Sequence, residues 1–351
     1  MRCWLGLHER LVGREWSRTM LNNTANLIRG ITIVLIACAL NLQATGPKKH
    51  GNDKPTLGSA PAVLWQEPVD IKTRDLYYGQ GGREHQPSGK FTFLQEKLNG
   101  VNPKFDIRDE EGIRWGVKMG DEARPETAAT RLIWAVGYFT NEDYYLPTLK
   151  IKSHRELPIT RGQALIKNNT IHGVRLKRHN KGEHEIADWA WDSNPFVGTR
   201  ELDGLKIMME LICNTDLKPV QQHVYDVHGI EQRYVAADVG ASFGKAGKTI
   251  WRTKANLADY ESLPLIKKAG PEYVDFWFFK HIPREHAIWI GGYLNQLSDA
   301  QIRDAFRAGG FSTQEIARYS RKVREKINEL VGLKETKAQK RRVEDELAVS
   351  R

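Results

Sequence analysis

The sequence predicts an α+β protein with two lobes, a β-rich N-terminal lobe followed by a helical C-terminal lobe. Two observations lead to this prediction. Apolar and polar residues alternate in 105–109 and 113–118, as in paired strands, whereas the chain from residue 281 onward shows only helical patterns. We expect the N-terminal lobe to cover about residues 91–200 and the C-terminal lobe about residues 201–333.

Residues 1–44 have the pattern of a secretory leader. Arg29 precedes an apolar run that is too short to span a membrane, and Ala37 and Ala39 fit a signal-cleavage site. Cys38 also fits a bacterial lipobox, in which it would carry a lipid anchor, and a short buried helix is a third possibility. We expect an exported protein that is periplasmic, envelope-anchored or secreted.

The composition argues against a disulfide-stabilised protein and against a nucleic-acid-binding protein. The chain has 351 residues, a formal charge of +10 and three cysteines. Removal of the leader leaves Cys213 alone or with Cys38, so no disulfide framework is expected. Part of the positive charge lies in a basic tail, residues 334–351. Because no aromatic residues interleave with the basic ones, we expect no nucleic-acid partner.

The segment between the leader and the first lobe is expected to be a linker followed by irregular structure. Residues 45–62 are rich in Gly, Pro, Lys and Ser, and residues 63–90 contain a glycine cluster. We therefore place the start of the folded domain at residue 91.

The N-terminal lobe should contain a short amphipathic segment, 91–98, and then the hairpin 105–118, with Gly112 in its turn. Pro125 should open a helix that runs from Glu126 to Phe139, because proline suits the first turn and glutamate complements the helix dipole there.

The rest of the chain predicts short strands within 147–195 and then elements with clearer patterns. Capping-box sequences begin the last two expected helices, 298–308 and 313 to about 333. The expected elements are a helix at 202–213, a buried strand at 234–238, and helices at 283–296, 298–308 and 313 to about 333.

Five polar residues occur in an order that suits phosphoryl transfer. Lys118 ends a strand, and Glu126 begins a helix. Asp216 and Gln221 lie in a polar loop after an apolar helix, and Asp238 ends a buried strand before a glycine-rich turn. Phosphoryl transfer needs a lysine for phosphate oxygens, a carboxylate that holds it, a carboxylate base and oxygen ligands for Mg²⁺.

These segments resemble three motifs of the protein-kinase superfamily. The run Asp216-Leu-Lys-Pro-Val-Gln221 is similar to the catalytic loop, Asp238-Val-Gly240 to the metal-binding Asp-x-Gly, and Gly-Val-Lys118 to the strand lysine. The run from Asp238 to Gly244 is closer to atypical members, namely the secreted four-jointed and Golgi casein-kinase type, and more distantly HipA and phosphoinositide kinases. The resemblance covers about residues 90–330 and implies a two-lobed kinase-like fold.

The resemblance implies a site for ATP near Lys118. This lysine would contact the nucleotide phosphates, and Glu126 would pair with it, with Glu122 as the competitor for that role. The sequence has no Gly-x-Gly-x-x-Gly loop before Lys118, and the segment 99–103 would take its place.

The same resemblance implies that Asp216 is the catalytic base for an unidentified hydroxyl acceptor. Asp238 would be the main ligand of Mg²⁺ or Mn²⁺, and Gln221, or Gln222, a second ligand. Glutamine stands where kinases have asparagine, so the alternative is a catalytically inactive kinase-like module that binds a protein partner. A third possibility is an envelope protein unrelated to kinases, in which the Asp238 turn is only structural.

Overall fold

The computed structural model describes residues 60–333, except 101, 215 and 246–252. The predicted leader, the Cys38 anchor site and the basic tail therefore lie outside the described residues. Within the described part, no helix is both long enough and apolar enough to cross a membrane.

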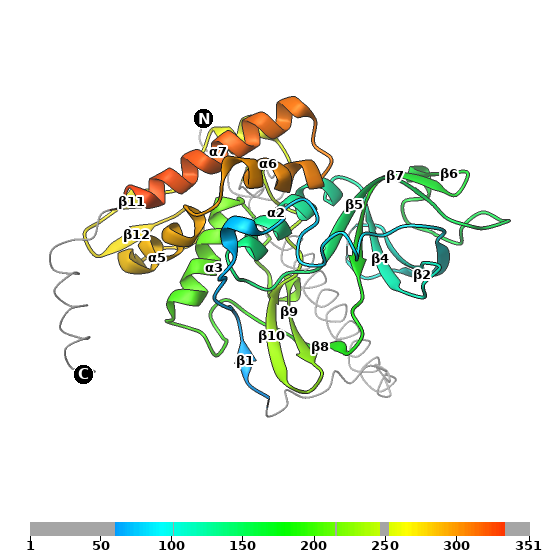
Figure 1. The fold of residues 1–351 in the computed structure, drawn as a ribbon, viewed down its shortest axis with the longest axis horizontal. Coiled ribbons are helices and arrows are strands. Elements are labelled where there is room, and N and C mark those ends of the chain that lie inside the picture. The colour runs from blue at the N-terminus through cyan, green and yellow to red at the C-terminus, as the bar shows by residue number, and fades with distance from the viewer. Residues whose placement is uncertain (1–59, 101, 215, 246–252, 334–351) are drawn as a thin grey trace, which may run out of the picture. The chain divides into compact units, whose positions relative to one another are not determined.

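The first lobe is built on a six-stranded sheet in the order β2-β3-β4-β7-β5, with β6 paired to β7 (Figure 1). All of its strand pairs are antiparallel. Its strands are β2 (Thr92–Lys97), β3 (Lys104–Arg108), β4 (Arg114–Met119), β5 (Asp143–Lys150), β6 (Ile166–Lys167) and β7 (Thr170–Arg178).

This sheet has its own hydrophobic core, which includes Phe105, Ile107, Trp115, Val117 and Leu176. The predicted hairpin is present, because β3 and β4 pair with Ile107 opposite Trp115 and Phe105 opposite Val117. Alternation thus identified the strands that bury one face against this core.

Helix α2 (Ala123–Ala135) begins three residues earlier and ends four residues earlier than predicted. Pro125 lies inside the first turn, where its missing N–H removes no intrahelical hydrogen bond. Gly137, with φ of +97°, follows the end of the helix. The buried face of α2, including Leu132 and Ile133, belongs to the larger of the two cores.

A second sheet has the order β1-β10-β9-β8. The β9–β10 hairpin connects the predicted catalytic loop to Asp238, and the predicted buried strand corresponds to the end of β10. The strands are β1 (Ala62–Val63), β8 (Glu183–Asp188), β9 (Gln222–Val227) and β10 (Glu231–Ala236).

The remaining part of the second lobe is largely helical, as predicted. Capping boxes are present at Ser298 with Gln301 and at Ser312 with Glu315. Its helices are α3 (Arg200–Leu211), α4 (Leu257–Glu261), α5 (Arg284–Leu294), α6 (Asp299–Ala308) and α7 (Thr313–Val331). Short strands β11 (Lys268–Ala269), β12 (Tyr273–Asp275) and β13 (Ile282–Pro283) form a third sheet. The single-turn helices are η2 (Ile71–Thr73), η3 (Gln163–Leu165) and η4 (Pro219–Gln221).

The folded domain begins before residue 91. Strand β1 pairs in parallel with β10, and Leu64, Ile71 and Leu76 are buried in the larger core. The Gln301 side chain also donates to the Ile71 carbonyl at 2.7 Å. These apolar residues have neither helical nor strand spacing, so periodicity alone did not reveal that the segment is packed.

Candidate active site

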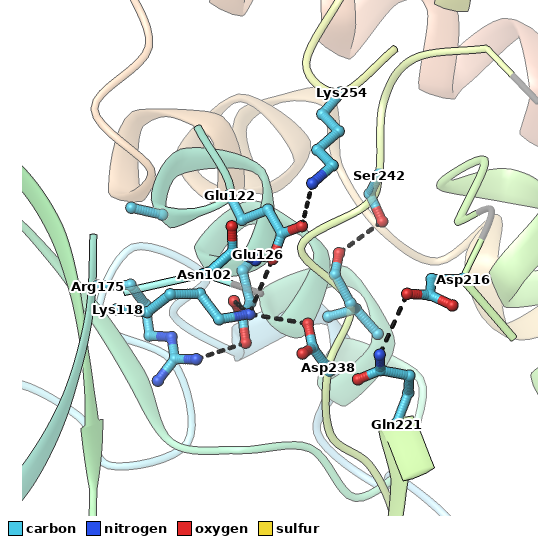
Figure 2. A network of polar contacts seen from close by, with 12 residues as sticks. Asn102, Lys118, Glu122, Glu126, Arg175, Asp216, Gln221, Asp238, Ser242 and Lys254 are labelled. Carbon is cyan, nitrogen blue, oxygen red and sulfur yellow. Dashed lines mark hydrogen bonds and ion pairs between the residues drawn. The ribbon is translucent and has the colours of Figure 1, made fainter. Parts of the chain in front are cut away.

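Lys118 lies at the centre of a buried cluster of charges (Figure 2). Its side chain is 1% exposed, and its Nζ lies 2.7 Å from Glu126 Oε2, 2.8 Å from Asp238 Oδ1 and 3.1 Å from Glu122 Oε2. Glu122 and Glu126, the two candidate partners of Lys118, therefore both contact its ammonium group. Glu122 is the N-cap residue of α2 and Glu126 lies one turn later, so both can face the same strand end.

Glu126 is fully buried and has a second cationic partner. Its Oε1 lies 2.7 Å from Nη2 of Arg175, which projects from β7, and Arg175 Nε lies 3.5 Å from Asp143 Oδ1. Sequence analysis missed Arg175. The signal was weak, because a single charged residue between Val174 and Leu176 in a strand is usually solvent-facing.

Glu122 links the cluster to two loops. Asn102 Nδ2, from the segment expected to replace a glycine-rich loop, donates to Glu122 Oε2 at 2.6 Å. Lys254 Nζ contacts the other carboxylate oxygen. Asn102 is therefore held at the start of α2, close to Lys118.

The turn after Asp238 requires small residues because other groups approach it closely. A Cβ added to Gly240 would lie 2.7 Å from Glu122 Cβ, and one added to Gly244 would lie 2.0 Å from the Thr253 carbonyl. Phe243 between them is fully buried, and its N–H donates to the Ile212 carbonyl at 2.7 Å. Close packing, rather than positive φ, explains both glycines.

Asp216 and Gln221 form a second polar pair near Asp238 (Figure 2). Gln221 Nε2 donates to Asp216 Oδ2 at 3.1 Å, and Lys218 Nζ lies 3.0 Å from Asp216 Oδ1. The Asp238 N–H donates to the Gln221 carbonyl at 3.0 Å, so the two loops are joined directly. Gln222, the alternative to Gln221, is buried within β9.

A cavity of about 140 Å³ lies between the lobes at this cluster. The sheet of the first lobe supplies Lys104, Lys118 and Arg175 to its lining, and the second lobe supplies Ala237 and Asp238. Its walls are therefore mainly polar and rich in basic side chains, which suits an anionic ligand.

The charges in the cluster stabilise one another. Burial opposes ionisation of Asp238, but the Lys118 ammonium outweighs it and holds the pKa of Asp238 well below its usual range. Burial likewise opposes the charge on Lys118, but Glu126 and Asp238 raise its pKa above the usual value. Burial raises the pKa of Glu126 against the opposing effects of Arg175 and Lys118.

The residues fit a divalent cation at Asp238. Its ionised carboxylate and the amide oxygen of Gln221 are hard oxygen ligands of the kind that Mg²⁺ and Mn²⁺ accept. Carboxylate oxygens of Glu122, Glu126 and Asp238 also lie within 4.8 Å of one another, but the Lys118 ammonium contacts all three. These three carboxylates are therefore already paired with a cation in this structure.

No known protein-family model matches the chain, and no curated protein matches its sequence. Among solved structures, the chain is similar to the proinflammatory kinase CtkA of Helicobacter pylori, with a TM-score of 0.46 and 10% identity over 74% of this chain and 98% of that one. It is also similar to a Golgi casein kinase, with a TM-score of 0.30 and 8% identity over 69% of this chain and 72% of that one. These sequence identities and TM-scores assign no role to any residue of this chain.

Proposed function

We propose that the protein is a kinase-like phosphotransferase that moves a phosphoryl group from ATP to a hydroxyl acceptor. The observation that supports this most is the contact of Lys118 Nζ with both Glu126 and Asp238. Lys118 and Asp238 are 120 residues apart in the chain. A lysine held by a helical carboxylate beside a metal-binding aspartate is the arrangement that phosphoryl transfer requires.

Each residue then has a specific role. Lys118 binds phosphate oxygens while Glu126 holds it in position, and Asp216 accepts the proton of the attacking hydroxyl. Asp238 and Gln221 would hold Mg²⁺ or Mn²⁺, which when bound neutralises charge on the phosphates. The amide of Gln221 also orients the Asp216 carboxylate through the bond at 3.1 Å.

Thermal-shift titration of the full chain with Mn²⁺ and ATP tests the nucleotide site. We expect a metal-dependent rise in melting temperature, because a ligand that binds only the folded state stabilises it. Asp238→Asn should abolish the rise, and the exposed Asp192→Asn should keep it. The absence of any shift at millimolar ATP would contradict nucleotide binding and favour a protein unrelated to kinases.

Catalysis is tested separately by following ATP consumption and phosphate incorporation with candidate hydroxyl acceptors. Asp216→Asn should keep ATP binding and lose transfer at least a hundredfold, because it removes the base without removing phosphate contacts. Full transfer activity in this variant would rule out Asp216 as the base.

A kinase-like binding module without transfer activity is the second candidate. The observation that favours it is Gln221, which stands where kinases have the metal-binding asparagine and whose amide group donates to Asp216 Oδ2 at 3.1 Å. Metal-dependent ATP binding without detectable turnover on any acceptor would support this candidate over the enzyme.

We also propose that the protein is exported, as the sequence of residues 1–44 suggests. The mass of the N-terminus of protein recovered from a bacterial host tests this. Cleavage after Ala39 supports an ordinary signal peptide, and a lipid-modified Cys38 supports an envelope anchor. An intact N-terminus in the cytoplasm would contradict export.

A further inference from the structure

Lys104 is a second lysine in the cavity that contains Lys118 and Asp238. It begins β3, and in the β3–β4 pair it lies directly opposite Lys118. Directly opposite residues of an antiparallel pair have their side chains on the same face, with Cβ atoms about 5 Å apart. The side chains of Lys104 and Lys118 therefore both lie on the face of the sheet that lines the cavity.

Lys104 differs from the other lysines and the arginine of the cavity lining in making no ion pair or hydrogen bond to a carboxylate or hydroxyl group of the described residues. Among the residues that the structure describes, no ion pair or hydrogen bond joins Lys104 Nζ to a carboxylate. The others are each matched: Lys97 by Asp106 at 3.1 Å, Lys177 by the Tyr225 hydroxyl at 2.8 Å, Arg175 by Glu126 at 2.7 Å, and Lys118 by its three carboxylates.

The Lys104 ammonium lies close to Gly100, a residue of the loop that follows β2. A Cβ added to Gly100, which has a φ of +73°, would be 3.4 Å from Lys104 Nζ. Asn99 of the same loop lines the cavity. Burial and the neighbouring Lys118 ammonium lower the pKa of Lys104 against the opposing effects of Asp238 and Glu126. A partly buried ammonium beside a like charge, without a counter-ion of its own, favours the binding of an anion.

We propose that Lys104 binds the phosphate chain of the donor together with Lys118, and that it adds positive charge there because three carboxylates already neutralise Lys118. The identity of the donor as ATP rests on the proposed function. The role of Lys104 concerns only the phosphate groups of the donor and not its nucleoside. Inorganic tripolyphosphate is therefore the probe that separates phosphate binding by Lys104 from the identity of the donor as ATP.

The test is isothermal titration calorimetry of the full chain with Mn-ATP, Mn-tripolyphosphate and adenosine. Lys104→Gln should raise the Kd of both phosphate ligands about ten- to hundredfold, the effect of losing a hydrogen bond to a charged group. Adenosine affinity should stay unchanged, and Lys104→Arg should restore most of the phosphate affinity. Lys150→Gln, an exposed lysine of the same sheet, is the matched control and should behave as wild type.

The outcomes distinguish the inference from the proposed function. If wild type binds tripolyphosphate through Lys104 but binds no nucleotide, the phosphate site stands and the proposed function fails. If wild type binds ATP and Lys104→Gln binds it equally well, the inference about Lys104 is overturned and the function stands. Equal losses of adenosine and ATP affinity in Lys104→Gln would indicate a structural role and overturn the inference too. Failure of wild type to bind any phosphate ligand overturns both.

Discussion

Removal of the Arg175 guanidinium should strongly destabilise the protein. Arg175→Met leaves Glu126 with Lys118 as its remaining cationic partner and removes the ion pair to Asp143. Both carboxylates are fully buried, and the Arg175 side chain is 8% exposed. Breaking a buried ion pair from one side costs about 3–5 kcal/mol, because an uncompensated charge stays in the interior.

Urea unfolding of the full chain measures this cost. We expect Arg175→Met to lower the free energy of unfolding by about 3–5 kcal/mol. Arg321→Met, which removes an exposed ion pair on α7, should cost less than about 1 kcal/mol.

A compensated variant separates lost charge pairing from lost packing. Arg175→Met combined with Glu126→Gln and Asp143→Asn should recover at least half of the lost stability, because no carboxylate then stays buried without its cation. A cost below about 1 kcal/mol for Arg175→Met, or no recovery in the compensated variant, would refute the reasoning.

Three further predictions concern single side chains. Burial lowers the pKa of Lys326 to about 8, so Lys326→Met should raise the free energy of unfolding by about 1–3 kcal/mol at pH 7, measured in urea, and the gain should shrink between pH 8 and pH 10.5, because the folded chain there releases the lysine proton that the unfolded chain keeps. Burial lowers the pKa of His179 to about 4, so its neutral form stabilises the fold above pH 6.5, and melting temperature should fall between pH 6.5 and pH 4 more in wild type than in His179→Gln; parallel curves would contradict this. Gly240→Ala should lower unfolding free energy by about 1–3 kcal/mol, because its Cβ would lie 2.7 Å from Glu122 Cβ, and an unchanged urea midpoint would disprove the close contact.

The elements with strong local signals were predictable from the sequence. The hairpin of β3 and β4 alternates between apolar and polar residue types, and the last two helices begin with capping boxes that the structure contains. The α+β class follows from the same signals. The helix α2 was found with shifted ends, because proline is tolerated anywhere in a first turn and does not mark its first residue.

The site was predictable only in its principal residues. The order of Lys118, Asp216 and Asp238 suggested a kinase-like arrangement, and the structure brings Lys118 and Asp238 together at 2.8 Å. The expected pairing of Lys118 with Glu126 is present at 2.7 Å, because a tight turn brings the start of α2 back over the strand end.

What the sequence by itself determined is the set of local elements and the residue types that can perform phosphoryl transfer. Only the tertiary structure decided that Arg175 faces Glu126, that residues 62–90 are packed into the domain and that Lys104 has no described counter-ion. The physical reason is that burial and electrostatic partnership depend on distances between side chains far apart in the chain. A local pattern reports which face of a strand or helix is apolar, but it carries no information on which distant charge lies opposite.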